Sequence, residues 1–273
     1  MRILAWPATD VGRVRSHNED SHLVDDELGL YLVADGMGGH AGGAHASQLC
    51  VDIVAKVVRR GLESLTGVDP DHRNAAIAEI LCAAASEASA RIFDQAAADT
   101  RLQGMGTTLT GLFIYGDRGY VVHVGDSRAF LMRGGGCRQL TNDHSWLNEQ
   151  VQAGLLTEEE AAHSDLKHII TRSVGFERHV EADVIPLNVT LGDAFLLCSD
   201  GMANYIEGAE IGELARDHWY ADLPQLCLDL ANKRGGDDNI TVVVAYVGNG
   251  SDVRKRGREV RVQATDTLPP GKV

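Results

Sequence analysis

Short runs of strand-forming residues recur along the chain and alternate with polar turns. The runs are rich in Val, Ile, Leu, Phe and Tyr, a composition typical of β-strands. They cover residues 28–34, 108–115, 119–124, 129–133, 194–198 and 240–247. Turns such as "YGDRGY" and "RGGGCR" are short enough to form hairpins, so the sequence predicts a mainly antiparallel sheet.

Two stretches after the first run follow a helical pattern. Their apolar residues are three and four positions apart, which places each set on one face of a helix. They are Leu49, Cys50, Ile53, Val54 and Val57 in one stretch and Ile77, Ile80, Leu81, Ala84, Ala88 and Ile92 in the other. Gly67 and Pro70 break the pattern between them. We therefore expect an antiparallel pair of helices lying on the sheet.

The second half of the chain contains further helical signals. Helices are predicted at 207–218 and at 223–234, the latter opened by Pro224 and closed by Gly235. In the region 144–175, Thr157 and Glu160 form a capping box, but the polar "HSDLKH" cuts that helix short. We interpret 144–175 as a surface flap. Strands, then a block of helices, then more strands indicate an α+β fold.

Composition limits the class of protein. With 273 residues, 44% of them hydrophobic, the chain can bury a large core in one sizeable domain or two small ones. No stretch approaches the roughly 20 apolar residues of a membrane-spanning helix, and "MRILAWPATD" is too short for a signal peptide. A cytoplasmic protein with no membrane span is expected. The cysteines have no C-x-x-C pair, so we expect reduced thiols, mainly in the core.

The charge is strongly negative. A formal charge of -14 argues against a nucleic-acid partner, which requires a basic face, and it fits a protein that holds cations. The segment 249–273 is locally basic and ends in proline and glycine. This segment is expected to be a disordered tail after a domain that spans 1–248.

Carboxylates stand where several predicted strands begin or end. Asp35 follows "YLVA", Asp126 follows "YVVHVG", Asp200 follows "AFLLCS", and Asp238 precedes "NITVVVAY". For any one of these positions, a common Asp-containing turn is the simpler interpretation. Together, however, they would repel one another unless cations neutralise them. Oxygen ligands without a Cys or His set favour Mg²⁺ or Mn²⁺.

The stretch "TDVGRVRSHNEDS" adds two more carboxylates and two arginines. Glu19 and Asp20 could supply ligands, while Arg13 or Arg15 could clamp an anion. A structural salt bridge is the alternative interpretation.

Seven motifs together carry a family resemblance. "DVGRVRSHNEDS", "VADGMGGHAGG", "GMGTTLTG", "HVGDSRAFL", "LTNDHS", "LLCSDGM" and "GGDDNITVVV" occur in this order between residues 9 and 247. In this respect the chain resembles the metal-dependent serine/threonine protein phosphatases of the PP2C type (the PPM family), in their compact bacterial form. The resemblance implies two packed antiparallel sheets flanked by helices, a four-layer α-β-β-α architecture.

The resemblance also implies a metal centre of two Mn²⁺ or Mg²⁺ ions. Asp35 would bridge the ions and the Gly36 carbonyl would be a further ligand. Asp200 and Asp238 would hold one ion, and Asp126 a third, weaker one shared with Asp200. The remaining ligands, direct or through water, would be Glu19 and Asp20.

Two further residues match catalytic positions of the family. Arg15 resembles the phosphate-binding arginine, and its planar fork suits two phosphate oxygens; Arg13 is the weaker candidate. His40 in "GMGGH" would be the general acid that protonates the departing seryl or threonyl oxygen.

One segment departs from the family pattern. Bacterial relatives carry a flap resembling "HPxRNVITRALG", where this chain has "HSDLKHIITRSVG" with Lys167 and His168 in place of Arg and Asn. A lysine is a point charge and not a fork, so substrate preference need not carry over. By analogy, the partners are phosphorylated proteins, including a cognate Hanks-type kinase and its substrates, and a monomer is expected.

The sequence offers three other functions, two of which it argues against. A cysteine-dependent phosphatase needs a cysteine six positions before an arginine, which no cysteine here has. A serine hydrolase is suggested only by "GDSRA" around Ser127, which lacks the final glycine of a nucleophile elbow. The alternative that stays open is a catalytically inactive PP2C-like fold that binds phosphoproteins.

Overall fold

Two five-stranded antiparallel sheets pack face to face in this computed structural model, which describes residues 1–39, 42–65, 67–162, 164, 166 and 169–249. The first sheet has the order β1-β12-β11-β8-β9 and the second β10-β7-β6-β3-β2. The strands of the first sheet are β1 (Arg2–Asp10), β12 (Ile240–Gly248), β11 (Ala194–Cys198), β8 (Arg128–Arg133) and β9 (Gly136–Gln139). Those of the second are β10 (Asp183–Asn188), β7 (Arg118–Val124), β6 (Leu109–Tyr115), β3 (Leu30–Ala34) and β2 (Ser21–Asp25). A small ladder joins β4 (Gly36–Met37) to β5 (Gly106–Thr107).

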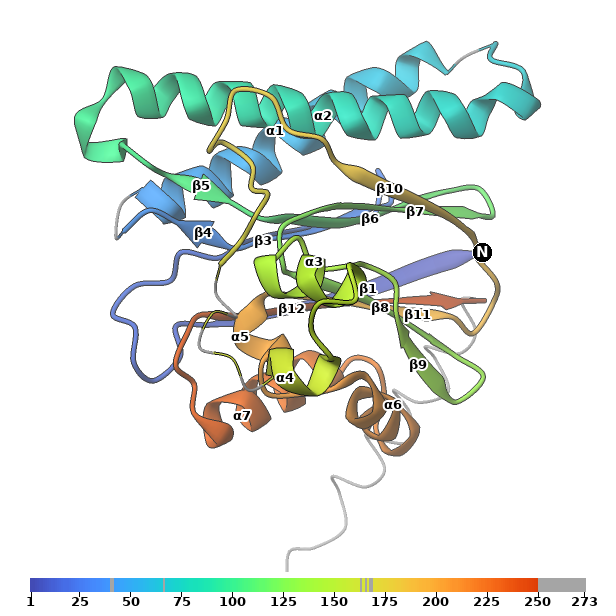
Figure 1. The fold of residues 1–273 in the computed structure, drawn as a ribbon. Coiled ribbons are helices and arrows are strands. Elements are labelled where there is room, and N and C mark those ends of the chain that lie inside the picture. The colour runs from blue at the N-terminus through green and yellow to red at the C-terminus, as the bar shows by residue number, and fades with distance from the viewer. Residues whose placement is uncertain (40–41, 66, 163, 165, 167–168, 250–273) are drawn as a thin grey trace, which may run out of the picture.

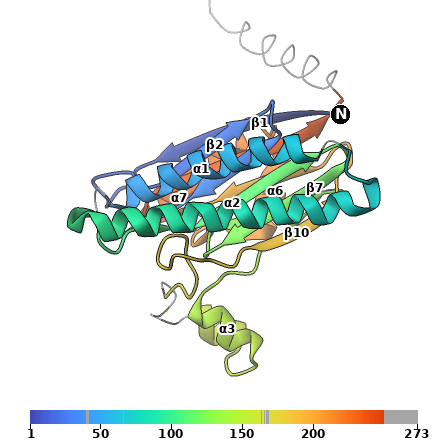
Figure 2. The same ribbon diagram turned by 90° about the horizontal axis from the view of Figure 1, so that it is seen from above.

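Helices cover the outer face of each sheet (Figure 1). The long helices α1 (Gly42–Ser64) and α2 (Pro70–Ala98) lie on the second sheet, and Figure 2 shows them side by side above it. The other face is covered by α5 (Asp200–Ala203), α6 (Gly208–Asp217) and α7 (Leu223–Arg234). The four-layer α-β-β-α architecture predicted from the sequence is confirmed.

The central strands are apolar on both faces because they contribute to two core layers. In β12, Val242 and Val244 pack toward the helices, whereas Val243 and Ala245 pack into the layer between the sheets. This double burial explains why the central strands are continuous hydrophobic runs without alternation.

The sequence missed several elements and predicted others well. Strands β1, β2, β9 and β10 were not predicted, and neither was α3 (Trp146–Gln152) in the flap. The α7 boundaries match the prediction, and α6 differs from it by one residue at each end. The capping box is also present: the Thr157 amide donates to Oε2 of Glu160 (2.8 Å), and the Glu160 amide donates to Oγ1 of Thr157 (3.2 Å).

The flap leaves the sandwich and returns to it. Figure 2 shows α3 projecting beyond the layered body, and α4 (Glu158–Ala162) follows it. On its return the chain pairs with β5, where the Thr107 amide donates to the Val174 carbonyl (2.9 Å) and the Val174 amide donates back (2.8 Å). Within the described ranges, no helix is long and apolar enough to cross a membrane. Of the cysteines, Cys50, Cys198 and Cys227 are buried, as expected, and Cys82 is exposed.

Candidate metal and phosphate site

The predicted carboxylates lie in the connections that follow or precede strands of both sheets. Asp35 lies between β3 and β4, Asp126 between β7 and β8, and Asp238 just before β12. Asp200 is the first residue of α5, directly after β11, and Glu19 and Asp20 precede β2. Residues far apart in sequence are therefore delivered to one end of the sandwich.

Hydrogen bonds fix the backbone of Asp35. Its amide donates to Oγ1 of Thr108 (2.9 Å), and its carbonyl accepts from the Thr108 amide (2.9 Å) and from Oγ1 of Thr107 (2.8 Å). Both threonines are fully buried. Because both the amide and the carbonyl of Asp35 are hydrogen-bonded, the direction in which its side chain leaves the backbone is defined.

The glycines around Asp35 allow three backbone segments to touch. The Gly36 amide donates to the Glu19 carbonyl (3.2 Å). A Cβ on Gly36 would stand 2.2 Å from the Gly43 carbonyl oxygen, and one on Gly43 would stand 1.9 Å from Oε2 of Glu19. The loss of side chains after Asp35 is thus required by the approach of α1 to the Glu19 segment.

Asn239 ties the N-terminal loop to the loop before β12. Its Oδ1 accepts from the Glu19 amide (2.7 Å), and its Nδ2 donates to the carbonyls of Val11 and His17 (2.9 Å each). The residue is 5% exposed, so these bonds satisfy a buried amide. The sequence placed Asn239 at the mouth of the strand but did not predict this role.

Burial and like charges raise the pKa values of three of the clustered acids, Asp20, Asp35 and Asp126. The pKa of Asp35 is raised well above its ordinary value, first by burial and then by neighbouring carboxylates. Those neighbours are Asp20, Asp200, Asp126 and Asp238. The pKa of Asp126 rises to about 7 through burial and the charges of Asp200 and Asp143. The acids are therefore close enough to oppose one another's ionisation.

Asp20 is the best example of an acid that needs a counter-ion. Burial raises its pKa to about 7, against hydrogen bonds from Thr241 and Ser199. The Ser199 hydroxyl donates to Oδ2 of Asp20 (2.8 Å). Its other oxygen, Oδ1, is buried and has no hydrogen-bond partner. An oxygen in this position fits a cation ligand.

Arg15 stands at the edge of the acidic group. Its guanidinium bonds Oδ2 of Asp238 (2.6 Å), and its side chain is 55% exposed. Burial lowers the pKa of Arg15, but the charges of Asp238, Glu19 and Asp35 outweigh it and raise the pKa overall. The exposed guanidinium is placed to meet an anion beside the carboxylates. Arg13 is instead held by its backbone, which donates to the Gly236 carbonyl (2.7 Å).

The donor set fits hard divalent cations. All of the side chains are carboxylates, which suit Mg²⁺ or Mn²⁺. A bound cation would lower the raised pKa values of Asp20, Asp35 and Asp126 again by neutralising the charge. Among the described residues, no group of three or more His, Cys, Asp or Glu side chains is close-set enough to hold an ion as it stands.

A cavity separates the acidic group from the flap. Its volume is about 510 Å³, and Asp126 and Asp200 line it on one side. Leu147, Asn148 and Val151 of the flap helix α3 line it on the other. A substrate chain could therefore contact the flap while its reacting group lies near the carboxylates.

Some predicted residues lie outside the described ranges, and the rejection of a serine hydrolase agrees with the burial of Ser127. His40 of the proposed acid role, Lys167 and His168 of the flap, and the segment 250–273 are not among the described residues. Ser127 is fully buried, and its hydroxyl lies 2.8 Å from Oγ1 of Thr108. It is not available as the nucleophile of a serine hydrolase.

Comparisons with known proteins agree with this arrangement. The family description "Protein phosphatase 2C" matches residues 12–233. The serine/threonine phosphatase Stp of Listeria monocytogenes is 33% identical over 255 residues, which cover 92% of this chain and 97% of that protein. The protein phosphatase PhpP of Streptococcus pneumoniae is 37% identical over 241 residues, which cover 86% and 94%.

Solved structures give the same result. The catalytic domain of the serine/threonine protein phosphatase PstP, in complex with two manganese ions, superposes with a TM-score of 0.75 at 33% identity, covering 91% of this chain and 99% of that one. With sequence and structure matched over most of its length, the chain belongs to the protein phosphatase 2C family and is an enzyme of the phosphatase class.

Proposed function

We propose that this chain hydrolyses phosphoserine and phosphothreonine in proteins at a centre of two Mn²⁺ or Mg²⁺ ions. The observation that carries the proposal is the cluster of carboxylates that raise one another's pKa values at one end of the sandwich. When bound, the two ions would activate a water for direct attack on phosphorus and offset the charge of the phosphoryl oxygens. The relatives' printed names, serine/threonine phosphatases, support the substrate class.

The chain's own residues would divide the work as follows. Asp35, whose main chain is bonded on both sides, would bridge the two ions, with the Gly36 carbonyl as a further ligand. Asp200 and Asp238 would complete one ion's ligands, and Asp126 would share a third, weaker ion with Asp200. Glu19 and Asp20 would act directly or through water.

Two residues would handle the phosphate and the leaving group. Arg15 would exchange its bond with Asp238 for a bidentate contact with two phosphate oxygens, which orients the phosphoryl group for in-line attack. His40 would donate a proton to the departing seryl or threonyl oxygen. Hydrolysis by direct attack of water needs no phosphoenzyme.

Turnover with and without metal tests this function. The purified protein should hydrolyse p-nitrophenyl phosphate and a phosphothreonine peptide in Mn²⁺, and EDTA should abolish both activities. Asp35→Asn should lose turnover by at least about 100-fold while its circular dichroism spectrum stays unchanged. Binding of the phosphopeptide without turnover would favour the inactive, phosphoprotein-binding alternative, and near-normal activity of Asp35→Asn would refute the bridging role.

The cellular role is proposed by analogy with the family. Its partners would be phosphorylated proteins, among them a cognate Hanks-type serine/threonine kinase and that kinase's substrates, with the protein acting as a cytoplasmic monomer. Comparing the phosphoproteome of a deletion strain with that of its parent tests this role, because the direct substrates should gain phosphoserine and phosphothreonine.

A further inference from the structure

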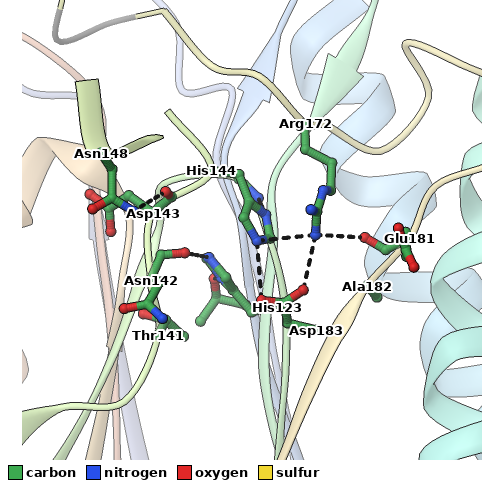
Figure 3. A network of polar contacts seen from close by, with 12 residues as sticks. His123, Thr141, Asn142, Asp143, His144, Asn148, Arg172, Glu181, Ala182 and Asp183 are labelled. Atoms are coloured by element: carbon green, nitrogen blue, oxygen red, sulfur yellow. Dashed lines mark hydrogen bonds and ion pairs between the residues drawn. The ribbon is translucent and has the colours of Figure 1, made fainter. Parts of the chain in front are cut away.

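His144 lies where the flap joins the turn that carries Asp126. It is 8% exposed and begins the flap, directly before the N-cap residue of α3, Ser145. Figure 3 shows Arg172 and Asp183 converging on its ring. None of these three residues has a part in the proposed hydrolysis, yet together they form a buried polar cluster that calls for a physical reason.

His144 holds Gly125, the residue before Asp126, at two points. Its amide donates to the Gly125 carbonyl (2.7 Å), and its ring Nδ1 lies 3.1 Å from the Gly125 amide. Gly125 has φ of +108°, and a Cβ there would stand 2.7 Å from Cγ2 of Thr108. The turn that directs Asp126 is therefore both unusual in conformation and clamped from one side by His144.

The partners of the His144 ring determine its tautomer. A backbone amide can only donate, so Nδ1 must be the unprotonated acceptor and Nε2 must carry the hydrogen. Nε2 lies 3.3 Å from Oδ2 of Asp183, to which it donates. Arg172 approaches Nε2 at 3.2 Å, but its true acceptors are Oδ1 of Asp183 (2.9 Å) and the Glu181 carbonyl (3.2 Å).

The returning end of the flap binds to the same residue. The Thr171 amide donates to the His144 carbonyl (2.9 Å), and the neighbouring Arg172 is ion-paired with Asp183 of β10. His123 is fully buried, and the centroid of its ring lies 4.7 Å from that of the His144 ring. The His144 ring therefore has little room to rotate. Both ends of the flap therefore meet at His144, the residue that also contacts Gly125.

We propose that His144 is a positioning residue: held by Asp183 and Arg172, it orients the Gly125–Asp126 turn and couples the docking of the flap to the placement of the Asp126 carboxylate. This inference rests on the proposed metal-binding role of Asp126. His144 touches neither the substrate nor an ion in this scheme. It acts through Gly125. A substrate that shifts the flap would therefore change the position of the Asp126 carboxylate through the His144 ring.

Calorimetric titration of Mn²⁺ into the metal-free protein tests the coupling. Asp126→Ala should remove the weakest Mn²⁺ binding event, and His144→Ala should weaken that event by about 10- to 100-fold. The double variant should bind Mn²⁺ no more weakly than Asp126→Ala alone, because the two residues act as a unit. If His144→Ala weakens Mn²⁺ binding as much in the Asp126→Ala variant as in the wild-type protein, the two residues act independently and the proposal is overturned.

Two near-isosteric variants separate positioning from general stability. His144→Asn can place its amide oxygen, an acceptor, at the Nδ1 position, whereas His144→Gln can place its amide nitrogen, a donor, at the Nε2 position and leaves no acceptor at the Nδ1 position. His144→Asn should therefore restore Mn²⁺ affinity to within a few-fold of wild type, and His144→Gln should not. His179→Ala is the control, because this exposed histidine, which lies between the flap and β10, contacts Ser86 and is not part of the cluster.

Nitrogen NMR of the wild-type histidines provides a readout independent of folding defects. The proposal requires an unprotonated Nδ1 and a protonated Nε2 in His144 at neutral pH; the opposite tautomer would overturn it. Failure of the wild-type protein to bind Mn²⁺ or to turn over p-nitrophenyl phosphate would refute the proposed function itself. If His144→Ala bound Mn²⁺ with the same affinities as the wild-type protein, only the positioning role would be refuted.

Discussion

Asp20 illustrates how a single side chain can be costly to the fold and useful to the site. Burial raises its pKa to about 7, and its Oδ1 is a buried oxygen without a partner. A protein would not retain such a group for stability alone, because replacing it with a neutral side chain relieves the charge. Strain of this kind is expected where a cation is to be bound.

The pH dependence of unfolding should reveal this cost. The folded pKa of Asp20 lies above the unfolded value of about 4, so between pH 4 and 7 the folded protein binds more protons than the unfolded one. In the metal-free protein, the contribution of Asp20 to the free energy of unfolding is favourable at low pH and is lost as pH rises through about 7. Asp20→Asn should therefore become more stable than wild type as pH rises from 4 to 8, by on the order of 3 kcal/mol.

Chemical denaturation of metal-free protein across this range measures the difference. Burial lowers the pKa of His123 to about 3 and also lowers the pKa of His144. Both shifts favour stability at higher pH. Wild type and Asp20→Asn share these histidines, so their contribution cancels when the two unfolding free energies are subtracted. Asp217→Asn, an exposed position at the end of α6, is the control. A constant difference between Asp20→Asn and wild type would contradict the assignment.

At the scale of elements, the strands that the sequence missed lie mostly at sheet edges. β1 and β10 are edge strands, and each contains a proline, Pro7 and Pro186. Proline is tolerated at an edge because one side of the strand needs no ladder partner. It also weakens the sequence signal for a strand. Central strands such as β3 and β12 were found because burial on both faces makes them continuously apolar.

The candidate site was predictable in part, for a related reason. Strands that end at the same edge of a sandwich deliver their following residues together, so Asp35, Asp126 and Asp200 could be grouped from sequence. The cluster of His144, Arg172 and Asp183 could not be, because it joins the two ends of an irregular flap to an unpredicted strand. No local pattern encodes such a contact.

The junction of α1 with the Glu19 segment gives a prediction in which two effects oppose each other. Alanine favours a helix over glycine by at most about 1 kcal/mol. A Cβ on Gly43, however, would stand 1.9 Å from Oε2 of Glu19, which can move aside, and 2.9 Å from the backbone carbonyl carbon of Gly36, which cannot. The clash should win, so Gly43→Ala should lose about 1–3 kcal/mol of stability and bind Mn²⁺ about 10- to 100-fold more weakly. Thermal unfolding and Mn²⁺ calorimetry measure the two effects.

Gly136→Ala serves as the control for that substitution. The nearest atom to a Cβ on Gly136 is the Arg133 carbonyl oxygen, 3.7 Å away, so the substitution should cause no loss of stability and no change in Mn²⁺ affinity. If Gly43→Ala were stabilising, helix propensity would outweigh the contact, and the close approach of α1 to Glu19 would not be a constraint on the site.

At the scale of the whole molecule, the layer between the sheets holds the acidic group together. Asp35 follows a strand of the second sheet, whereas Asp200 and Asp238 adjoin β11 and β12 of the first. Their separation therefore depends on how the two sheets pack. The layer contains Tyr31, Val33, Leu112, Val121, Leu131, Phe195, Leu197, Val243 and Ala245.

Phe195→Ala should test this dependence. Phe195 is 1% exposed, belongs to the layer between the sheets and stands in β11, which leads directly to Asp200. Truncating a buried phenylalanine costs about 3–5 kcal/mol, and loosening this layer should also weaken Mn²⁺ binding, because the carboxylates lie on both sheets. Phe176→Ala, at a position 71% exposed, should change stability by less than about 0.5 kcal/mol and leave Mn²⁺ binding unchanged. If Phe195→Ala lowered stability but bound Mn²⁺ like wild type at a temperature where it is fully folded, the geometry of the metal site would be set by the loops alone and not by the packing of the two sheets.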